Sequence, residues 1–271
     1  MSLDRAAPVP LSVVVPSLNQ GHFIRRTLDS ILDQSIENLE VIVVDGGSGD
    51  DTLEVLRGYG ERITWTSEPD RGQSDAINKG LRRARGEIVC YLNSDDLFEP
   101  GALRAVLDHF AAHPGTQWLF GRCRIIDGAG APIRSLVDTY KTLWARFVRL
   151  RASLLVLNYI PQPATFWRAS ATAQVGLIDE SLYYAMDYDL WLRLSTLGRP
   201  AFLDRYLASF RIHDGSKSLN GARKQLAEAC DVAQRHGAGA LLPLHRAHDR
   251  ATLLAYGSRY DQKIQPAGSH A

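Results

Sequence analysis

The first 115 residues or so alternate between two apolar periodicities, and this alternation limits the folds open to the chain. Short runs rich in β-branched residues are each followed by a segment with apolar residues at helical spacing, and the runs lie at 11–15, 41–44, 63–65 and 88–92. Buried strands that alternate with helices pair into a parallel sheet covered on both faces. The sequence therefore predicts an α/β fold built on a mostly parallel sheet.

The order of predicted strands and helices changes in the second half of the chain. Apolar, β-rich segments predict strands at 118–126, 164–168 and 201–212. Helical spacing predicts helices at 139–157 and 187–197. The later strands therefore no longer follow the simple strand–helix alternation of the first half.

The C-terminal residues carry a helical pattern of their own. The segment 219–262 is typical of two helices, broken near 237–243. A chain of 271 residues is long enough for one large domain with an appendage. We therefore expect one domain over 9–218 and a helical C-terminal extension, 219–271, packed on it.

The composition excludes several classes of protein. A formal net charge of +1 argues against a general polyanion binder, so no nucleic-acid partner is expected. The first ten residues lack the apolar region of a secretory signal, and the apolar stretch 154–160 is too short to span a bilayer. The cysteines Cys90, Cys123 and Cys230 have no metal-ligand spacing and cannot all pair internally. These features favour a cytoplasmic protein whose membrane contact, if any, is peripheral.

Polar residues follow each of the first four predicted strands. Any single one, such as Ser48 or Asp96, could be a turn or helix-capping residue. Ligands of open α/β sheets bind at the carboxyl ends of the strands, so four such clusters favour a shared site. The clusters contain Pro16, Ser17, Asn19, Asp45, Asp70, Arg71, Asn93, Ser94, Asp95 and Asp96.

The turn after the first strand lacks both common phosphate-binding patterns, G-x-G-x-x-G and G-x-x-x-x-G-K-[ST]. A bound diphosphate would then need another source of positive charge, and a divalent cation held by acidic oxygens is the usual alternative. Asp95 and Asp96 supply such oxygens. We expect one of the two to bind the metal and the other to cap the next helix.

Six motifs, in this order and spacing, give the chain a recognisable pattern. They are LSVVVPSLNQ, VIVVDGGSGDDT, EPDRGQSDAINKG, LNSDD, MDYDLWLRL and RIHDGSKS, spread from residue 11 to 218. With them the chain resembles a family 2 glycosyltransferase with the GT-A fold, in which a Rossmann-type, mostly parallel sheet is flanked by helices. The last fifty or so residues match no motif of that family.

The resemblance implies an inverting, metal-dependent transfer of a sugar from a nucleotide-diphosphate donor, with a UDP-sugar favoured. The acceptor would be a hydroxyl of a glycan, of a lipid-linked molecule or of a small molecule, as in polysaccharide biosynthesis. By position, nucleotide binding is implied for residues after all four strands and on the helix after the third. These residues are Pro16, Ser17, Asn19, Asp45, Asp70, Arg71, Asp75, Asn93 and Ser94.

The resemblance also implies a site for Mn²⁺ or Mg²⁺. Asp95 stands where the family's D-x-D motif provides the metal ligand, and His213 resembles a late residue that reaches the metal or the diphosphate. Asn93 departs from the commoner Asp and removes one negative charge beside the ribose and the metal. The alternative for His213 is a surface-loop histidine without a ligand.

Asp187 matches the residue that acts as catalytic base in the family, and Met186 replaces the Glu that usually precedes it. The apolar face of the helix that follows puts Asp187 in its first turn, where the helix dipole favours an ionised carboxylate. Asp189 is the competing base, but two positions are about 200° around a helix, so both cannot face one cleft. A third possibility is that Asp187 only caps the helix.

A second function stays open at this stage. Asn93 and Met186 would also suit a sugar-nucleotide or glycan binding module that has lost turnover. The presence of Asp95, Asp187 and His213 together favours the enzyme. A sugar nucleotidyltransferase ranks lower, because its glycine-rich, basic loop is absent after the first strand.

The segment 141–157 mixes cationic and apolar side chains in the way expected of an interfacial helix. It predicts a peripheral membrane contact, or a face for a lipid-linked acceptor. The alternatives are a helix that covers the acceptor site and a homodimer contact with solvated arginines. The side chains concerned are Lys141, Arg146, Arg149 and Arg151, beside Leu143, Trp144, Phe147 and Leu150.

Overall fold

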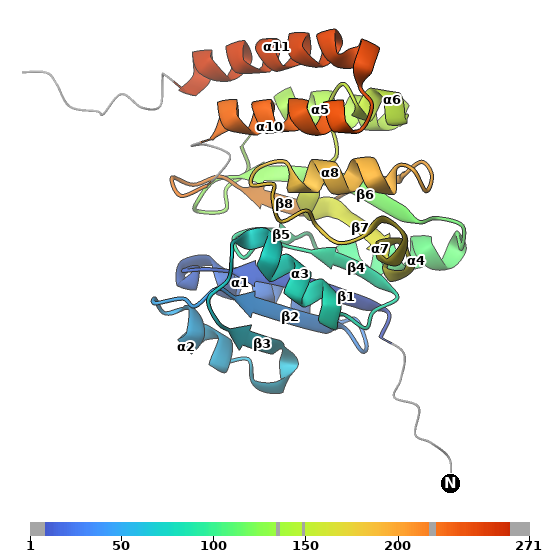
Figure 1. Cartoon of the computed structure of the whole chain (residues 1–271). Helices are drawn as coiled ribbons and strands as arrows, with labels where there is room; N and C mark the ends of the chain where they lie inside the picture. The colour runs from blue at the N-terminus through green and yellow to red at the C-terminus, as the bar shows by residue number, and fades with distance from the viewer. Residues whose placement is uncertain (1–8, 134–135, 148–149, 217–220, 261–271) are drawn as a thin grey trace, which may run out of the picture.

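The computed structural model describes residues 9–133, 136–147, 150–216 and 221–260. They form a mixed α/β fold around an eight-stranded sheet with the strand order β3-β2-β1-β4-β7-β6-β8-β5 (Figure 1). The strands are β1 (Leu11–Ser17), β2 (Glu40–Asp45), β3 (Thr64–Ser67), β4 (Ile88–Tyr91), β5 (Leu97–Phe98), β6 (Trp118–Ile126), β7 (Thr165–Arg168) and β8 (Ala201–Arg211).

The first half of the chain builds the parallel part of the sheet, as predicted. Strands β3, β2, β1 and β4 are parallel neighbours. The helices between them are α1 (Gly21–Leu32), α2 (Thr52–Arg57) and α3 (Gln73–Arg83). Each strand therefore ends at the same edge of the sheet, which brings the polar turns together.

The second half turns the sheet into a mixed one. Strand β7 is antiparallel to both β4 and β6, and β6 is parallel to β8. The short β5, which the sequence did not predict, pairs antiparallel with β8. Two reversals restore the original direction, so β6 and β8 end at the same edge as β1 and β4. This places the residues after β8 beside the turn after β4.

In the described part of the chain, seven further helices cover the sheet and extend from it. The predicted helix at 139–157 is wrong as a single element, because the structure has a longer helix followed by one short turn. The helices are α4 (Ala102–Ala112), α5 (Leu136–Phe147), α6 (Arg151–Leu154), α7 (Ala169–Val175), α8 (Met186–Leu194), α10 (Ala222–Arg235) and α11 (Leu242–Tyr260). Single 3₁₀ turns lie at Gly60–Arg62, Gln162–Ala164 and Gly239–Leu241.

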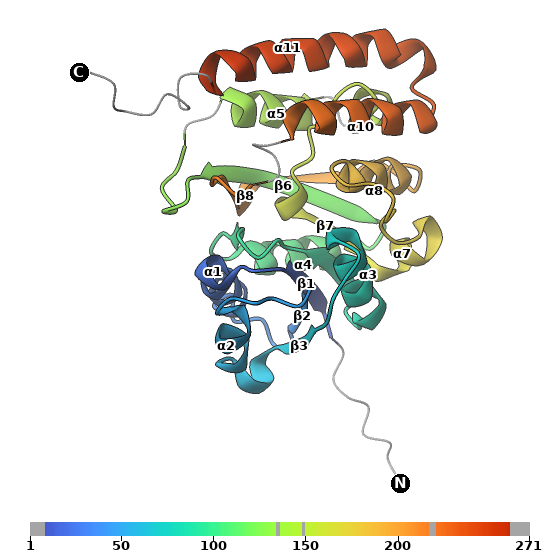
Figure 2. The same ribbon diagram turned by 60° about the vertical axis from the view of Figure 1, so that its left-hand side comes forward.

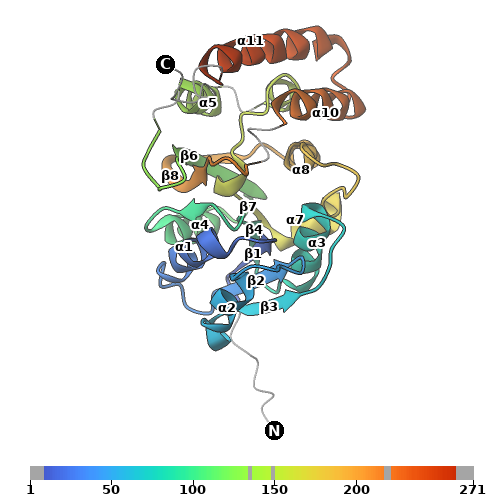
Figure 3. The same cartoon turned by 90° about the vertical axis from the view of Figure 1, so that its left-hand side faces the viewer.

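The last two helices lie in layers beyond α8. Helix α10 packs between α8 and α11, and Figures 2 and 3 show the same order of layers from two further sides. Helix α11 also contacts α5, through the stacked rings of Tyr140 and His248. Within the described ranges, no helix is long and apolar enough to cross a membrane.

Helix α3 packs closely on β1. All seven residues of β1 are buried, and Val14 faces Gly80 of α3. A Cβ atom at Gly80 would lie 2.3 Å from Val14 Cγ1. Only glycine permits this close approach, which fixes the N-terminal end of α3 near the carboxyl ends of the strands.

Candidate active site

The carboxyl ends of three parallel strands form one row of polar side chains. Ser17 ends β1 and pairs in register with Asp45 at the end of β2, which pairs in turn with Ser67 at the end of β3. The row continues through the backbone, because the Glu68 N–H donates to the Asp45 carbonyl (3.0 Å). The predicted residues Ser17 and Asp45 therefore lie side by side at one edge of the sheet.

The Asp45 carboxylate is buried, with 0% of the residue exposed. Its Oδ2 accepts hydrogen bonds from the backbone N–H groups of Gly47 (3.1 Å) and Ser48 (2.8 Å) and from the Ser67 hydroxyl (2.7 Å). Its Oδ1 accepts from the Ser48 hydroxyl. These charge-assisted bonds order the turn after β2. Because no part of Asp45 is exposed, a direct contact with a nucleobase stays a prediction.

The turn after β1 carries the other residues predicted to contact the base. Pro16 and Ser17 are buried, and the Ser17 hydroxyl has no hydrogen-bond partner in the described part of the chain. Asn19 is exposed and has a left-handed φ of 53°, which asparagine tolerates. Asn19 Oδ1 accepts from the Gly49 N–H (2.9 Å), and its own N–H donates to Ser48 Oγ (2.7 Å). The two turns are thus tied together.

The loop after β3 and the first turn of α3 bring Asp70, Arg71 and Asp75 to the same edge of the sheet. Asp70 lies against Gly46, where an added Cβ would be 2.5 Å from Asp70 Oδ2. The Arg71 guanidinium donates to Asp75 Oδ1 (3.0 Å) and to Glu180 Oε2 (2.7 Å), yet 75% of its side chain is exposed. The hydrogen bond from Arg71 is the largest cause that lowers the pKa of Asp75. Arg71 is therefore anchored but still open to an anionic ligand.

Asp95 and His213 meet although 118 residues separate them. His213 Nε2 lies 3.0 Å from Asp95 Oδ2, and both side chains are about four-fifths buried. The Gly215 N–H donates to His213 Nδ1 (3.3 Å), which leaves the proton of a neutral ring on Nε2, directed at Asp95. The ring also packs against Phe23, with centroids 4.6 Å apart. The two predicted metal ligands therefore share one site.

These two side chains offer only part of a metal coordination shell. Among the described residues there is no group of three or more His, Cys, Asp or Glu side chains that could hold a metal. Mg²⁺ in nucleotide enzymes is commonly held by one or two carboxylates, while substrate phosphates and water complete the shell. A carboxylate and an imidazole at hydrogen-bond distance fit such a partial site.

Asp96 differs from its predicted role. It is fully buried, and its Oδ1 accepts from the Arg211 backbone N–H (2.9 Å). Burial, and then the neighbouring charge of Asp95, raise the pKa of Asp96 well above its ordinary value. The next helix, α4, has Gly101 as its N-cap, so the prediction that one acid of the pair caps this helix is wrong.

Asn93 is the centre of an amide network beside Asp95. Its Oδ1 accepts from Gln73 Nε2 (2.7 Å), and its Nδ2 donates to Gln162 Oε1 (3.2 Å) and to Asp96 Oδ2 (3.3 Å). An aspartate here could not donate these last two bonds. Asn93 is therefore part of a hydrogen-bonded network, while Ser94 is buried and accepts at its carbonyl from the Thr27 hydroxyl (2.8 Å).

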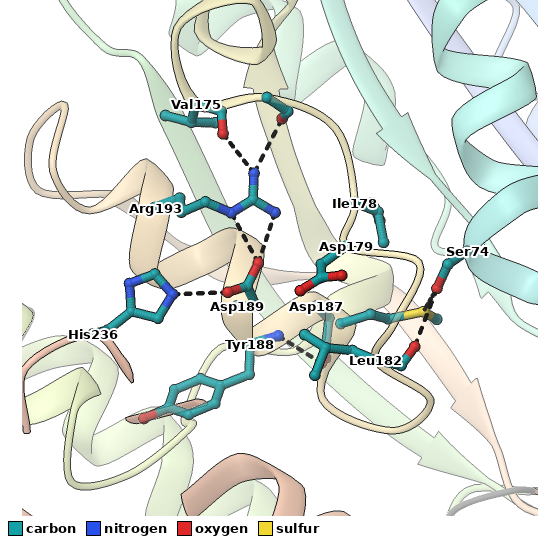
Figure 4. Close-up of polar contacts among 12 residues, drawn as sticks. Ser74, Val175, Ile178, Asp179, Leu182, Asp187, Tyr188, Asp189, Arg193 and His236 are labelled. Carbon is teal, nitrogen blue, oxygen red and sulfur yellow. Dashed lines mark hydrogen bonds and ion pairs between the residues drawn. The ribbon is translucent and has the colours of Figure 1, made fainter. Parts of the chain in front are cut away.

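Asp187 lies in the first turn of α8, as predicted. The N-cap of α8 is Ala185, so Asp187 is the second helical residue and not the cap. Its Oδ1 accepts from the Tyr188 N–H (2.7 Å; Figure 4). Burial, and then the charges of Asp187 and Asp96, raise the pKa of Tyr91 well above its ordinary value. Asp187 thus lies close enough to strand β4 to interact with its last residue.

A second connection joins α8 to the turn after β4. The Ser74 hydroxyl donates to the sulfur of Met186 (2.8 Å), the residue just before Asp187. Its neighbour Gln73 donates to Asn93. The N-terminus of α3 therefore links the predicted base to the predicted metal site, and Met186 takes a packing role where the family's Glu would stand.

Asp189 is occupied elsewhere, as Figure 4 shows. Its Oδ2 accepts from Arg193 Nε (2.8 Å), and its Oδ1 lies 2.7 Å from His236 Nε2. Burial favours a raised pKa for Asp189, but the His236 hydrogen bond and the Arg193 charge outweigh it and lower that pKa. Arg193 also donates to the carbonyl of Val175 (2.6 Å). Asp189 therefore joins α8 to α10 and α7, away from Asp187.

The sequence interpretation missed Arg211, which begins the RIHDGSKS motif. Arg211 is 1% exposed, and its Nε donates to the Asp95 carbonyl (2.8 Å). Its NH1 donates to the carbonyls of Asp127 and Gly128 (both 3.1 Å). Burial, and then the charge of Arg26, lower the pKa of Arg211. Its place two residues before His213 in a matched motif was the signal that could have found it.

Asn78 of α3 was also missed. It is buried, its Nδ2 donates to the Ile178 carbonyl (2.9 Å), and its Oδ1 accepts from the Ile178 N–H (2.9 Å). Nδ2 also donates to Glu180 Oε1 (3.0 Å). Asn78 therefore anchors the start of the loop that leads into α8. A buried polar residue on the apolar face of α3 was the available signal.

Two cavities lie on different sides of the sheet. One of about 120 Å³ lies between the N-terminus of α3 and the loop before α8, and Ser74, Tyr183 and Met186 are among its lining residues. A larger one, of about 350 Å³, lies near the amino ends of β1 and β4, lined by Pro10 and Ile88 among others. The smaller cavity is the one beside the predicted chemistry, so size alone does not identify the site.

The predicted interfacial segment 141–157 is only partly described. The side chain of Lys141 and all of Arg149 lie outside the described residues. Arg146 pairs with Asp204 (2.5 Å), and Arg151 donates to the His236 carbonyl (3.3 Å). The two described arginines therefore have protein partners.

Solved structures with the same fold are known. The chain is similar to the mannosyltransferase PcManGT from Pyrobaculum calidifontis, solved with GDP-Man and Mn²⁺, with a TM-score of 0.66 and 22% identity over 98% of this chain and 79% of that one. It is also similar to residues 1–349 of S. aureus TarS, solved with UDP-GlcNAc, with a TM-score of 0.64 and 18% identity over 82% of this chain and 65% of that one. These similarities show the GT-A fold.

The sequence comparisons agree with the fold. The chain is 29% identical to a chondroitin synthase of Escherichia coli over 78% of its own length, and it spans 30% of the length of that relative. The model of Glycosyl transferase family 2 matches residues 12–168, which is more than half of the chain. The matched region contains the residues at the ends of the first four strands, whereas Asp187 and His213 lie beyond it, and the chain belongs to glycosyl transferase family 2.

Proposed function

We propose that the chain is an inverting glycosyltransferase that moves a sugar from a nucleotide-diphosphate donor to an acceptor hydroxyl. A UDP-sugar is the favoured donor, because S. aureus TarS was solved with UDP-GlcNAc. The GDP-Man complex of PcManGT makes a GDP-sugar the first alternative. The chondroitin synthase relative supports a glycan acceptor, and a lipid-linked or small-molecule acceptor fits the same chemistry.

The observation that carries the proposal is the meeting of Asp95 and His213, 3.0 Å apart, in the turns that follow β4 and β8. The turn after β4 supplies Asp95, and the segment after β8 supplies His213. The contacts of Gln73 and Ser74 link this pair to the residue before Asp187. A site for the leaving diphosphate and a candidate base are therefore supported within one region.

The proposed reaction is a single displacement. Asp187 takes the proton of the acceptor hydroxyl while its oxygen attacks the anomeric carbon of the donor. The bond from that carbon to the diphosphate oxygen breaks, and the nucleoside diphosphate leaves from the opposite face. A positioned carboxylate typically contributes about 10²–10⁴ in rate by this proton transfer. We assign the acceptor to the side of the smaller cavity, because Met186 and Tyr183 line it.

We propose that the nucleotide lies along the strand ends. The unpartnered Ser17 hydroxyl and the exposed Asn19 support base and ribose contacts at the turn after β1. Asp45 and Asp70 shape the neighbouring turn. The exposed guanidinium of Arg71, held by Asp75, supports a contact with the diphosphate. Pro16, Asn93 and Ser94 complete the proposed nucleotide site.

We further propose that Asp95 Oδ2 and His213 Nε2 hold Mn²⁺ or Mg²⁺ when the donor is bound, with the ring proton of His213 moved from Nε2 to Nδ1 so that Nε2 is free to ligate. Carboxylate and imidazole are suitable ligands, and the diphosphate can supply the remaining oxygens. The cation would offset the charge that develops on the leaving diphosphate. The chain's own part is to keep both ligands in place, which Arg211 supports through the Asp95 carbonyl.

A peripheral membrane contact by α5 is a weaker part of the proposal. Leu143 and Leu150 are exposed by 56% and 43%, which supports an interfacial face or a homodimer contact. Arg146 and Arg151 are engaged by Asp204 and by the His236 carbonyl, which leaves less positive charge for anionic lipid. Co-sedimentation with anionic vesicles at low salt separates the two, because only the membrane contact predicts it.

The first experiment is a thermal-shift screen with UDP, GDP, TDP and CDP, with and without Mn²⁺. A ligand that binds the folded state raises the melting temperature, so the preferred base and any metal effect appear together. Release of nucleoside diphosphate from a panel of donor sugars then tests turnover. Binding without release across the panel would favour a sugar-nucleotide binding module instead of the enzyme.

A further inference from the structure

The loop before α8 is held by a carboxylate from the C-terminal helix α10. Glu228 Oε1 accepts a hydrogen bond from the Tyr183 backbone N–H (3.0 Å). Its Oε2 accepts from the backbone N–H groups of Tyr184 (2.5 Å) and Ala185 (2.6 Å). Hydrogen bonds to an ionised acceptor are roughly twice as strong as neutral ones, so three on one carboxylate restrain the loop backbone.

The restrained residues are those that set the direction of Asp187. Ala185 is the N-cap of α8 and has no side-chain acceptor with which to cap the helix. Its backbone N–H is one of the groups that a helix N-terminus leaves unsatisfied, and Glu228 satisfies it from another helix. The negative charge of Glu228 is also placed where the helix dipole favours it. Asp187 follows two residues later.

Two more contacts join α10 to the same region. Gly221, the N-cap of α10, lies against the ring of Tyr184, where an added Cβ would be 2.4 Å from the ring. At the other end of α10, His236 Nε2 lies 2.7 Å from Asp189 Oδ1, in the turn of α8 that contains Asp187 (Figure 4). Helix α10 therefore holds α8 on both sides of Asp187.

The residues proposed to bind the donor are held by contacts other than those of α10. Among the described residues, the hydrogen bonds of Asp45 and Asp95 involve the sheet edge and its turns, and none of them involves α10. The loop before α8 is the element that both sides share, since Asn78 anchors its start and Glu228 its end. A change at Glu228 should therefore move the base without moving the nucleotide site.

We propose that Glu228 is a positioning residue that fixes the carboxylate of Asp187 for proton abstraction. This inference rests on the proposed role of Asp187 as the base. A displacement of about 1 Å in a reacting group can cost on the order of 10²-fold in rate. Loss of Glu228 therefore lowers kcat by roughly 10- to 100-fold, while KM for the donor changes by less than about twofold.

The first test measures the restraint itself and needs no substrate. Amide hydrogen exchange over residues 183–185 is compared in the unsubstituted protein, Glu228→Ala and Glu228→Gln. Faster exchange at these amides, most in Glu228→Ala, is the expected result. Asp231→Asn, an exposed acid on the same helix, serves as the control and leaves the exchange unchanged. Equal protection of 183–185 in Glu228→Ala would overturn the proposal.

The second test asks whether Glu228 acts through Asp187. Release of nucleoside diphosphate from UDP-GlcNAc and from GDP-mannose, with Mn²⁺, is measured for Glu228→Ala, Asp187→Asn and the double variant. We expect Glu228→Ala to lower kcat in the normal background and to have almost no further effect when Asp187 is Asn. An equal effect in both backgrounds, or an unchanged kcat, would contradict the positioning role.

The two tests also separate this inference from the function on which it rests. Full activity of Asp187→Asn would refute Asp187 as base, whatever Glu228 does. Rescue of kcat by Glu228→Gln, which keeps an acceptor oxygen and the side-chain length, supports positioning over a general loss of stability. Melting temperatures of all variants, measured in parallel, show whether a loss of rate reflects unfolding.

Discussion

His213 Nε2 lies 3.0 Å from Asp95 Oδ2, with Gly215 donating to the other ring nitrogen. The contact joins the turn after β4 to the segment after β8. It brings the two predicted metal ligands together without any other acid or histidine in the group, as far as the described residues extend. The metal proposal therefore depends on both side chains and on the donor's diphosphate.

We expect Asp95→Ala to stay folded and to lose metal-stimulated turnover. The Asp95 side chain is partly exposed, so its removal costs little packing, whereas the proposed cation loses its one carboxylate. Melting temperature with and without UDP and Mn²⁺ checks folding and ligand binding, and nucleoside diphosphate release checks turnover. Metal-stimulated release that persists in Asp95→Ala would rule out Asp95 as the principal ligand.

We expect Asp45→Asn to destabilise the protein and to weaken binding of the nucleotide. An amide side chain cannot accept on both ends, so at least one of the donors Gly47, Ser48 and Ser67 loses its acceptor. The expected loss is about 2–3 kcal/mol in the free energy of unfolding, typical of bonds to a buried charge. Urea unfolding measures it. An unchanged midpoint would mean that the turn is held by other contacts.

The Asp189 contact with His236 and Arg193 predicts a pH-dependent stability. The pKa of Asp189 is below its ordinary value of 3.8 in the folded protein, so its contribution is present above that pH and lost as the pH falls through the folded pKa. Asp189→Asn should therefore lower the free energy of unfolding by about 2 kcal/mol at roughly pH 6 and by less at roughly pH 3.5. Urea unfolding at both pH values tests this.

A surface ion pair provides the comparison for that experiment. Asp204 pairs with Arg146, and 43% of the Asp204 side chain is exposed. Asp204→Asn should change the free energy of unfolding by less than about 1 kcal/mol at either pH. The free energy of unfolding of Asp189→Asn should approach that of the unsubstituted protein as the pH falls. A difference that grows on acidification would contradict the lowered pKa of Asp189.

The contact of Gly80 with Val14 predicts that Gly80→Ala is destabilising. Alanine would ordinarily favour a helix by about 1 kcal/mol, but its Cβ would lie 2.3 Å from Val14 Cγ1. We expect the clash to outweigh the gain and to cost about 1–3 kcal/mol. Gly115→Ala is the control, because nothing lies within 4 Å of its Cβ position. Thermal unfolding of the two variants distinguishes them, and equal stability would disprove the clash.

The sequence predicted most elements because their patterns are local. β-branched runs and helical spacing located the first four strands and both C-terminal helices to within a few residues. Strand β5 has two residues and α7 has seven, which is too short for a periodic signal. The helix does not run through Leu150, whose backbone is extended (φ −99°, ψ 148°) and whose N–H donates to the Ser153 hydroxyl at the start of α6 (3.2 Å).

The place of a site residue was predictable from the sequence only where it is set by the end of a strand. Asp45 and Asp95 follow strands, so their place at one edge followed from the strand order. The role of Asp96 was not predictable, because it depends on the Arg211 backbone N–H, 115 residues away. The contact of Glu228 with Ala185 depends likewise on where α10 packs, and no motif marks that helix.

The most direct test of the account is the transfer rate of Asp187→Asn beside that of Asp189→Asn, under saturating donor and Mn²⁺. The account predicts that Asp187→Asn loses about 10²–10⁴ in rate while its affinity for the nucleoside diphosphate and its melting temperature stay close to those of the unsubstituted protein. Asp189→Asn should lower the melting temperature, and its transfer rate should fall less than that of Asp187→Asn. A near-normal rate in Asp187→Asn, or a collapse confined to Asp189→Asn, would contradict the account.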